Sequence, residues 1–154
     1  MKKILNKINK KNIHLSKKFN LNKFNDKDSL FYNLNSDLFE NNEINHKERI
    51  KGLNSLRKLL IQEKLFFLVA HNFALSAKVE QELGNIKESI QKSTKSYKLF
   101  NSMHSDNPLA VNGSIFAYSN LANIYSSLKL NNISLDYLYK AKKILHLCEK
   151  NYIP

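Results

Sequence analysis

Histidine and cysteine are the residues here best suited to metal binding or nucleophilic catalysis, and their spacing favours neither. The five histidines are His14, His46, His71, His104 and His146, and the single cysteine is Cys148. None of the histidines is three or four residues from another histidine or from the cysteine, the spacing that a metal pair on one helix requires. His146 and Cys148 would diverge by about 200° on a helix. We expect no metal site, and we expect Cys148 to be a small core residue.

Other catalytic signatures are also missing from the sequence. It has no phosphate-binding loop, no GxSxG motif and no dinucleotide fingerprint. His104 and Asp106 stand in a segment typical of a turn. We therefore expect a non-enzymatic protein without a cofactor. An enzyme that relies on Cys148 or on one dispersed histidine is the remaining alternative.

Lysine is concentrated at the amino terminus. Residues 1–24 contain eight lysines and no acidic residue, so they hold +8 of the formal net charge of +12 and leave residues 25–154 at +4. Lysines act on phosphate or on acidic surfaces as salt-sensitive point charges without base readout. The candidate contacts of this kind are Lys2, Lys3, Lys7, Lys10, Lys11, Lys17 and Lys18.

Residues 1–24 also place Ile4, Leu5 and Ile8 on one helical face, with lysines around the rest. A basic, amphipathic, acid-free start is typical of a mitochondrial targeting segment, although arginine is absent. Two other interpretations stay open, a retained basic arm on nucleic acid or acidic protein and a tail without a task. We expect an intracellular protein, mitochondrial or alternatively cytoplasmic. We expect no membrane span, because no apolar run reaches about 18 residues.

The rest of the chain, residues 25–154, reads as one all-α domain, since it has little Gly or Pro punctuation. Helices are expected over 26–40, from His46 to a hinge near 62–64, over 65–83 and 86–103, from Pro108 to Leu128, and from Ile133 to a frayed end at 151–154. Gly84 is expected to be left-handed. The expected apolar stripes include Leu30, Phe31, Leu34, Leu38 and Phe39, then Val111, Ile115, Tyr118, Leu121, Tyr125 and Leu128, then Ile133, Leu138, Leu145 and Cys148.

Small residues punctuate the last two of these helices. Ala122, Ser134 and Ala141 stand among large apolar and aromatic residues within 118–141. A small side chain lets the backbone of one helix approach another, and large neighbours fill the groove on either side. This pattern predicts two helices that pack closely.

The same pattern occurs twice and resembles a tetratricopeptide repeat. One unit has its large, small, glycine, small and small positions at Phe73, Ala77, Gly84, Ser89 and Ser96. The next unit has its corresponding residues at Tyr118, Leu121, Ala122, Tyr125, Ser134, Leu138 and Ala141. In that unit Lys129 stands in place of the turn glycine. The 45-residue offset from Phe73 to Tyr118 exceeds the usual length of about 34. The segments HSDNPLA and SNLANIY are similar to the longer repeats of kinesin light chains. The resemblance implies a short right-handed solenoid of antiparallel helix pairs, with about three hairpins.

In this family the first helix of each pair lines a concave face that holds a helix or extended peptide of another protein. The outward residues would be Ser119, Asn120, Asn123 and Ser126 on one first helix, and Ala74, Lys78 and Gln81 on the preceding one. Asn120 matches an amide that pairs with the main chain of a bound peptide in similar repeats.

The sequence thus predicts a protein-protein interaction scaffold or adaptor, a structural subunit of a larger assembly whose expected location is the mitochondrion. The alternative is an accessory protein of an organellar ribosome or other ribonucleoprotein, which would contact RNA through the amino-terminal lysines.

Overall fold

The computed structural model describes residues 2–18, 26–105 and 107–152, and within these ranges the regular structure is entirely helical. The helices are α1 Lys2–Lys18, α2 Asp26–Glu40, α3 His46–Gln62, α4 Phe66–Glu82, α5 Ile86–Ser102, α6 Pro108–Ser127 and α7 Asn131–Tyr152. The expected all-α class is confirmed, as is the break near 62–64 that separates α3 from α4. The last helix continues through Tyr152, so the expectation of a frayed end from residue 151 is wrong for residues 151–152.

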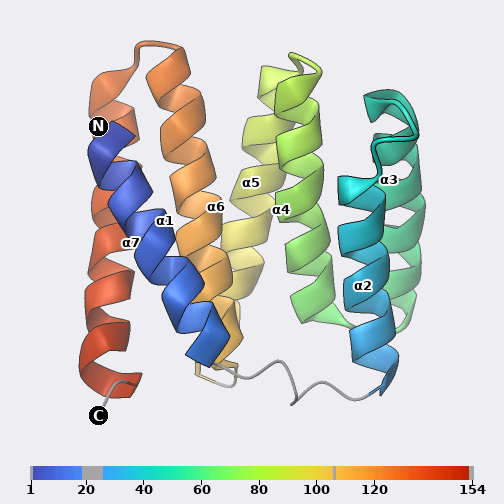
Figure 1. The fold of residues 1–154 in the computed structure, drawn as a ribbon, viewed down its shortest axis with the longest axis horizontal. Helices are drawn as coiled ribbons and strands as arrows, with labels where there is room; N and C mark the ends of the chain where they lie inside the picture. Colours follow the sequence, from blue (N-terminus) through green and yellow to red (C-terminus); the bar gives the residue numbers. More distant parts are fainter. Residues whose placement is uncertain (1, 19–25, 106, 153–154) are drawn as a thin grey trace.

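The helices form a row in which each packs against the next from α2 to α7 (Figure 1). Contacts also join α2 to α4 and α4 to α6, so α4 has neighbours on both sides. At the far end α1 packs against α6 and α7, although five helices separate it from α7 in the sequence order. The arrangement is compatible with a helical repeat, with α2 and α3 at one end and α1 and α7 at the other.

Two helix pairs, α4/α5 and α6/α7, share one contact between small residues. Ser89 Oγ donates to the backbone carbonyl of Ala77 at 2.7 Å, and Ser134 Oγ donates to that of Ala122 at 2.6 Å. All four residues are at most 1% exposed. Both contacts span the same 12 residues of sequence, and the second lies 45 residues after the first, the offset expected from the sequence. A hydroxyl can reach the facing main chain only where the two backbones lie close together.

Three helix ends use the same turn, with one left-handed residue in each. These residues are Lys64, Gly84 and Lys129, with φ of 56°, 81° and 61°. In each turn the left-handed residue donates its N–H to a carbonyl three residues earlier, and the next residue donates to one five residues earlier. This is the hydrogen-bond pattern that satisfies the last carbonyls of a helix. The left-handed conformation expected of Gly84 is confirmed.

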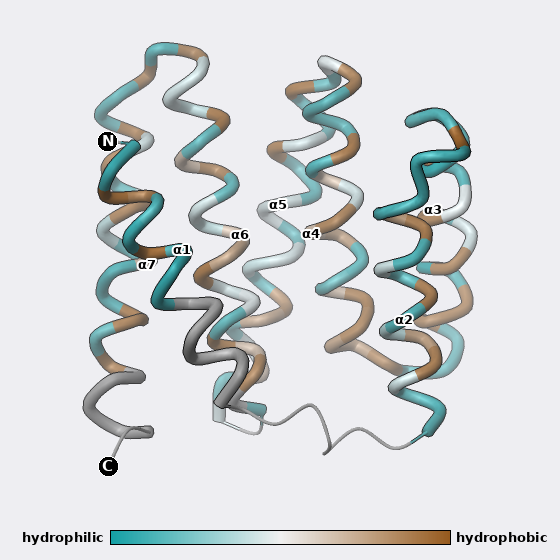
Figure 2. The backbone as a smooth tube through the Cα atoms, viewed as in Figure 1, coloured by the Kyte–Doolittle hydropathy of each residue, from teal (hydrophilic) through white to brown (hydrophobic). Residues whose placement is uncertain are grey.

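Aromatic and apolar side chains fill the joints between α5, α6 and α7. The ring of Tyr118 lies 4.7 Å from that of Tyr97 and 6.1 Å from that of Tyr137, measured between centroids. A Cβ added to Gly113 would lie 2.5 Å from the buried ring of Phe100, so α5 and α6 touch there through a glycine. Figure 2 shows the coloured part of α1 as largely hydrophilic. Its Ile8 is nevertheless 4% exposed, because it joins the core of α6 and α7.

Some residues expected on apolar inner faces are exposed instead. Leu30 and Leu34 are 57% and 38% exposed because α2 is the end helix of the row and has no neighbour on that side among the described residues. Leu128 and Ile133 are 43% and 41% exposed because they stand at the turn between α6 and α7. The expectation that Leu128 and Ile133 face inward is therefore wrong, and the apolar stripe expected on α2 is buried only in part. Ala122 and Ala141, at 1% and 0%, are buried as expected.

The turn at Lys129 gives a stability prediction. A left-handed residue with a Cβ costs roughly 1–2 kcal/mol relative to glycine. Glycine also has greater conformational freedom in the unfolded chain, which cancels about half of the stability gained by replacing such a residue with glycine. We expect Lys129→Gly to raise the free energy of unfolding by about 0.5–1 kcal/mol in urea titrations. Lys143→Gly, an exposed change inside α7, is the matched control and should lower it by about 1 kcal/mol. A loss at Lys129→Gly equal to that of the control would contradict the turn.

Candidate interaction surfaces

Lys78 of α4 is the expected site residue with the most specific surroundings. Its Nζ lies 5.8 Å from the ring centroid of Phe39 in α2 and 5.4 Å from that of Phe116 in α6. Three helices that are not consecutive in the chain therefore meet around one half-buried lysine. Aromatic faces attract a cation within about 6 Å and hold it in place. An ammonium positioned in this way can receive a carboxylate of a bound protein.

The other two residues expected to face outward on α4 differ from each other. Gln81 is half-buried. Ala74 is 2% exposed, so the expectation that it faces outward is wrong. The reason is that α4 is flanked by α2 and α3 on one side and by α5 and α6 on the other.

Ser119 and Asn120 of α6 do not face outward either. They are 4% and 8% exposed, and Asn120 Nδ2 donates to Ser93 Oγ of α5 at 2.9 Å. The amide expected to pair with a peptide is used inside the row, where it joins two helices. The expected outward orientation is therefore wrong for both residues, because α5 covers this side of α6.

Asn123 and Ser126, the other two candidates on α6, line a groove together with Lys2 of α1. Asn123 is exposed and Ser126 half-buried. The groove has a volume of about 270 Å³, and Leu5 and Leu138 contribute its apolar wall. The structure thus brings together Lys2, expected to contact phosphate, and two residues expected to contact protein.

The basic face of α1 is open to solvent. Lys2, Lys3, Lys7, Lys10 and Lys11 are exposed, as their helical positions around Ile8 require. Lys17 and Lys18 lie outside the residues whose side chains the structure describes, and so does Cys148.

A buried amide network at the joint of α2, α3 and α4 was not foreseen from the sequence. Asn35 and Asn72 are both 0% exposed, and Asn72 Nδ2 donates to Asn35 Oδ1 at 2.8 Å and to the carbonyl of Leu53 at 3.0 Å. Asn35 Nδ2 in turn donates to the carbonyl of Leu68. These bonds fix the orientation of both amides. The only sequence signal was asparagine at interior positions of helices, which is hard to recognise in a chain rich in asparagine.

His71 extends this network. Its ring stacks on Tyr32, with centroids 4.8 Å apart, and its Nδ1 lies 3.4 Å from Asn35 Nδ2. Because that amide nitrogen is a donor, Nδ1 must be the unprotonated acceptor. Burial lowers the pKa of His71 to about 4. The imidazole is therefore neutral at physiological pH.

A buried ion pair joins α4 to α5. Glu80 is 5% exposed and pairs with Lys92 of α5 and with Asn85. Burial alone would raise the pKa of this carboxyl, but hydrogen bonds from Lys92 and Asn85 and the nearby charge of Arg57 outweigh it and hold the pKa below its ordinary value. Arg57 also donates to Asn72 Oδ1 at 3.0 Å and lies over the ring of Phe73.

His104 and Ser114 lie within 2.7 Å of each other, a separation also found in catalytic pairs. Ser114 is fully buried and donates its proton to Asn101 Oδ1 at 2.7 Å. His104 Nε2 must therefore donate to the hydroxyl, which is the opposite of what a general base does. The contact connects the turn after α5 to α6. It places His104 in a structural role, beyond the turn chemistry expected of it; Asp106 lies outside the described residues.

Among the described residues, no group of three or more His, Cys, Asp or Glu side chains is placed to hold a metal ion. Over the same ranges, none of the helices combines the length and apolar character needed to cross a membrane. No family model, curated protein or solved structure matches the chain.

The neutral state of His71 predicts a dependence of stability on pH. Its folded pKa of about 4 lies below the ordinary 6.5, so the unfolded chain binds the extra proton between these values. Stability should fall as the pH drops through this window, by about 3 kcal/mol from this residue at full effect. We expect His71→Gln to show a shallower dependence of the urea unfolding free energy on pH than wild type. Exposed His146 gives the control, His146→Gln; equal slopes in all three proteins would contradict the assignment.

Proposed function

We propose that this chain is a non-enzymatic scaffold or adaptor for other proteins and a structural subunit of a larger assembly. In this proposal the row is a short right-handed solenoid of tetratricopeptide-like hairpins, α2/α3, α4/α5 and α6/α7. The recurrence of the Ser–Ala contact after 45 residues supports it, because repeat arrays reuse one contact between successive units. The first helices of the hairpins are then α2, α4 and α6.

The observation that carries the proposal is the position of Lys78. Its ammonium lies between rings supplied by α2 and α6, so all three proposed first helices contribute to one surface. An acidic or carboxylate-bearing segment laid across these helices would meet Lys78 at the centre and half-buried Gln81 a turn away. Exposed Asn123 on α6 would provide an amide contact farther along the face.

Affinity purification of the tagged protein after cross-linking in its native cells, read by mass spectrometry, tests this. Lys78→Ala and Lys78→Glu should lose partners that the wild type retains, the second more completely, because the acidic side chain repels a carboxylate. Lys98→Glu is the matched control, an exposed reversal on α5, and should retain them. Thermal unfolding would show that each variant folds. If both Lys78 variants capture the same proteins as wild type, this surface is not the binding surface.

One observation favours the second candidate, an accessory protein of an organellar ribosome or other ribonucleoprotein. The five lysines at the start of α1 are exposed, and α1 has no acidic residue to offset them. RNA binding of this kind would weaken steeply with salt and disappear on removal of residues 1–24, whereas binding at Lys78 would depend on that residue. We also propose a mitochondrial location, with the cytoplasm as the alternative. Mass spectrometry of the mature amino terminus would show whether residues 1–24 are removed as a targeting segment.

A further inference from the structure

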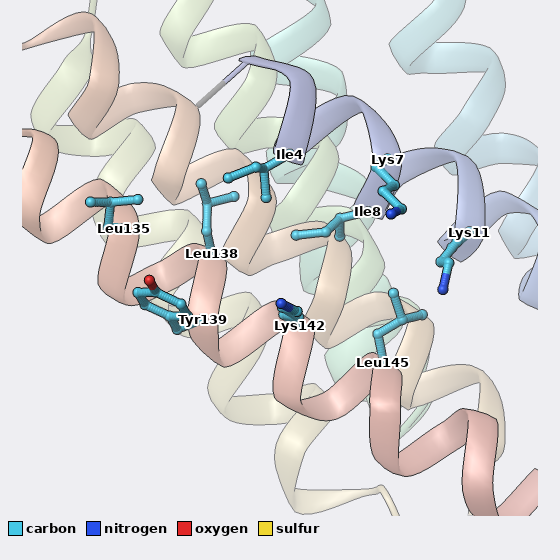
Figure 3. Close-up of a pocket in the computed structure, with 9 residues that line it drawn as sticks. All are labelled: Ile4, Lys7, Ile8, Lys11, Leu135, Leu138, Tyr139, Lys142 and Leu145. Carbon is cyan, nitrogen blue, oxygen red and sulfur yellow. The ribbon is translucent and has the colours of Figure 1, made fainter.

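A groove lies between α1 and α7 at one end of the row (Figure 3). It has a volume of about 320 Å³, and its apolar lining includes Ile4 and Ile8 of α1 and Leu138 of α7. Ile4 is 47% exposed and Tyr139, on the facing helix, is 65% exposed. The groove exists because α1 packs more extensively against α6 than against α7. Apolar side chains are therefore left open to a helix that could cover them.

Lysines surround this apolar lining. Lys7 and Lys11 come from α1 and Lys142 from α7, and none of the described residues that line the groove is acidic. Figure 3 shows the side chains of α1 and those of α7 facing one another across it. The best occupant is thus an amphipathic helix with apolar residues one turn apart and carboxylates beside them.

The opposite end of the row presents a helix face of this description. The outer stripe of α2 is a set of exposed residues within about 120° of the helix surface, on ideal geometry. The stripe consists of Asp26, Leu30, Asn33, Leu34, Asp37 and Glu40. It contains three carboxylates and no cation, and its two leucines are four residues apart, like Ile4 and Ile8 in the groove. Lys27 lies beside the stripe and pairs with Glu63, the residue that follows α3.

We propose that copies of this chain associate head to tail, with the α2 stripe of one copy seated in the α1/α7 groove of the next. The two surfaces lie at opposite ends of the row, so the contact joins different patches and can add copies in succession (Figure 1). Each copy carries a net charge of +12, so two copies repel each other overall. Salt at physiological concentration screens charges over about 8 Å, which weakens this long-range repulsion more than it weakens the attraction between opposite charges in direct contact. The inference does not rest on the scaffold function proposed above, because it uses other residues.

Charge reversals at the two ends test this contact in the full chain. Asp37→Lys with Glu40→Lys reverses the stripe, and Lys7→Glu with Lys142→Glu reverses the groove. Analytical ultracentrifugation from low to high micromolar concentration should show the wild-type mass rising with concentration. For each reversed variant alone, the dissociation constant of self-association should rise roughly tenfold or more, because like charges then face each other.

Mixing the two variants gives the decisive comparison. A reversed stripe complements a reversed groove, and the unaltered ends complement each other, so an equimolar mixture should recover the wild-type association. Glu88→Lys with Lys98→Glu, on exposed positions of α5, is the control and should associate like wild type. Circular dichroism would establish that each variant is folded.

Two results would overturn the proposal. One is a wild-type protein that stays monomeric at every concentration, which would leave the groove to an acidic segment of another protein. The other is self-association that both reversals leave unchanged, which would locate the contact between copies elsewhere. Neither result bears on capture of partners at Lys78, which is measured separately.

Discussion

Close approach of helix backbones at small residues is the constraint on which the rest of the row depends. In α4/α5 and α6/α7 a buried serine hydroxyl donates to the main-chain carbonyl of a buried alanine on the facing helix. Such a bond requires a short side chain on both helices, since a larger one would push the backbones apart. The tyrosines and leucines beside these crossings then fill the grooves that the close approach creates.

At the joint of α2, α3 and α4, hydrogen bonds between buried polar side chains hold the helices together. Asn35 and Asn72 bond to each other and to two main-chain carbonyls, so their amides are satisfied although fully buried. Glu80, Lys92 and Asn85 form a second satisfied cluster in the α4/α5 pair. Buried polar groups of this kind cost little while every partner is present and much when one is removed. The neutral imidazole of His71 belongs to the first of these two networks, because it lies next to the amide of Asn35.

Much of the fold was predictable because helix periodicity and small-residue spacing are local properties of the sequence. The breaks at Gly84 and Pro108, and the burial of Ala122 and Ser134, follow from them. What sequence spacing could not supply is the set of neighbours. Ala74 and Asn120 are buried because other helices flank theirs, Leu30 is exposed because α2 ends the row, and the return of α1 to α6 is not encoded in any nearby pattern. For the candidate site, Lys78 could be named in advance, but its position between Phe39 and Phe116 required the packing of three helices.

The free energy of unfolding of Ser134→Leu, compared with Ser134→Ala and wild type in urea, tests the close crossing most directly. Alanine removes one hydrogen bond and should cost about 1 kcal/mol, whereas leucine must also force α6 and α7 apart and should cost ~3 kcal/mol or more. A Ser134→Leu protein as stable as wild type would mean that the backbones do not approach closely at this residue, and the account of the row would fail.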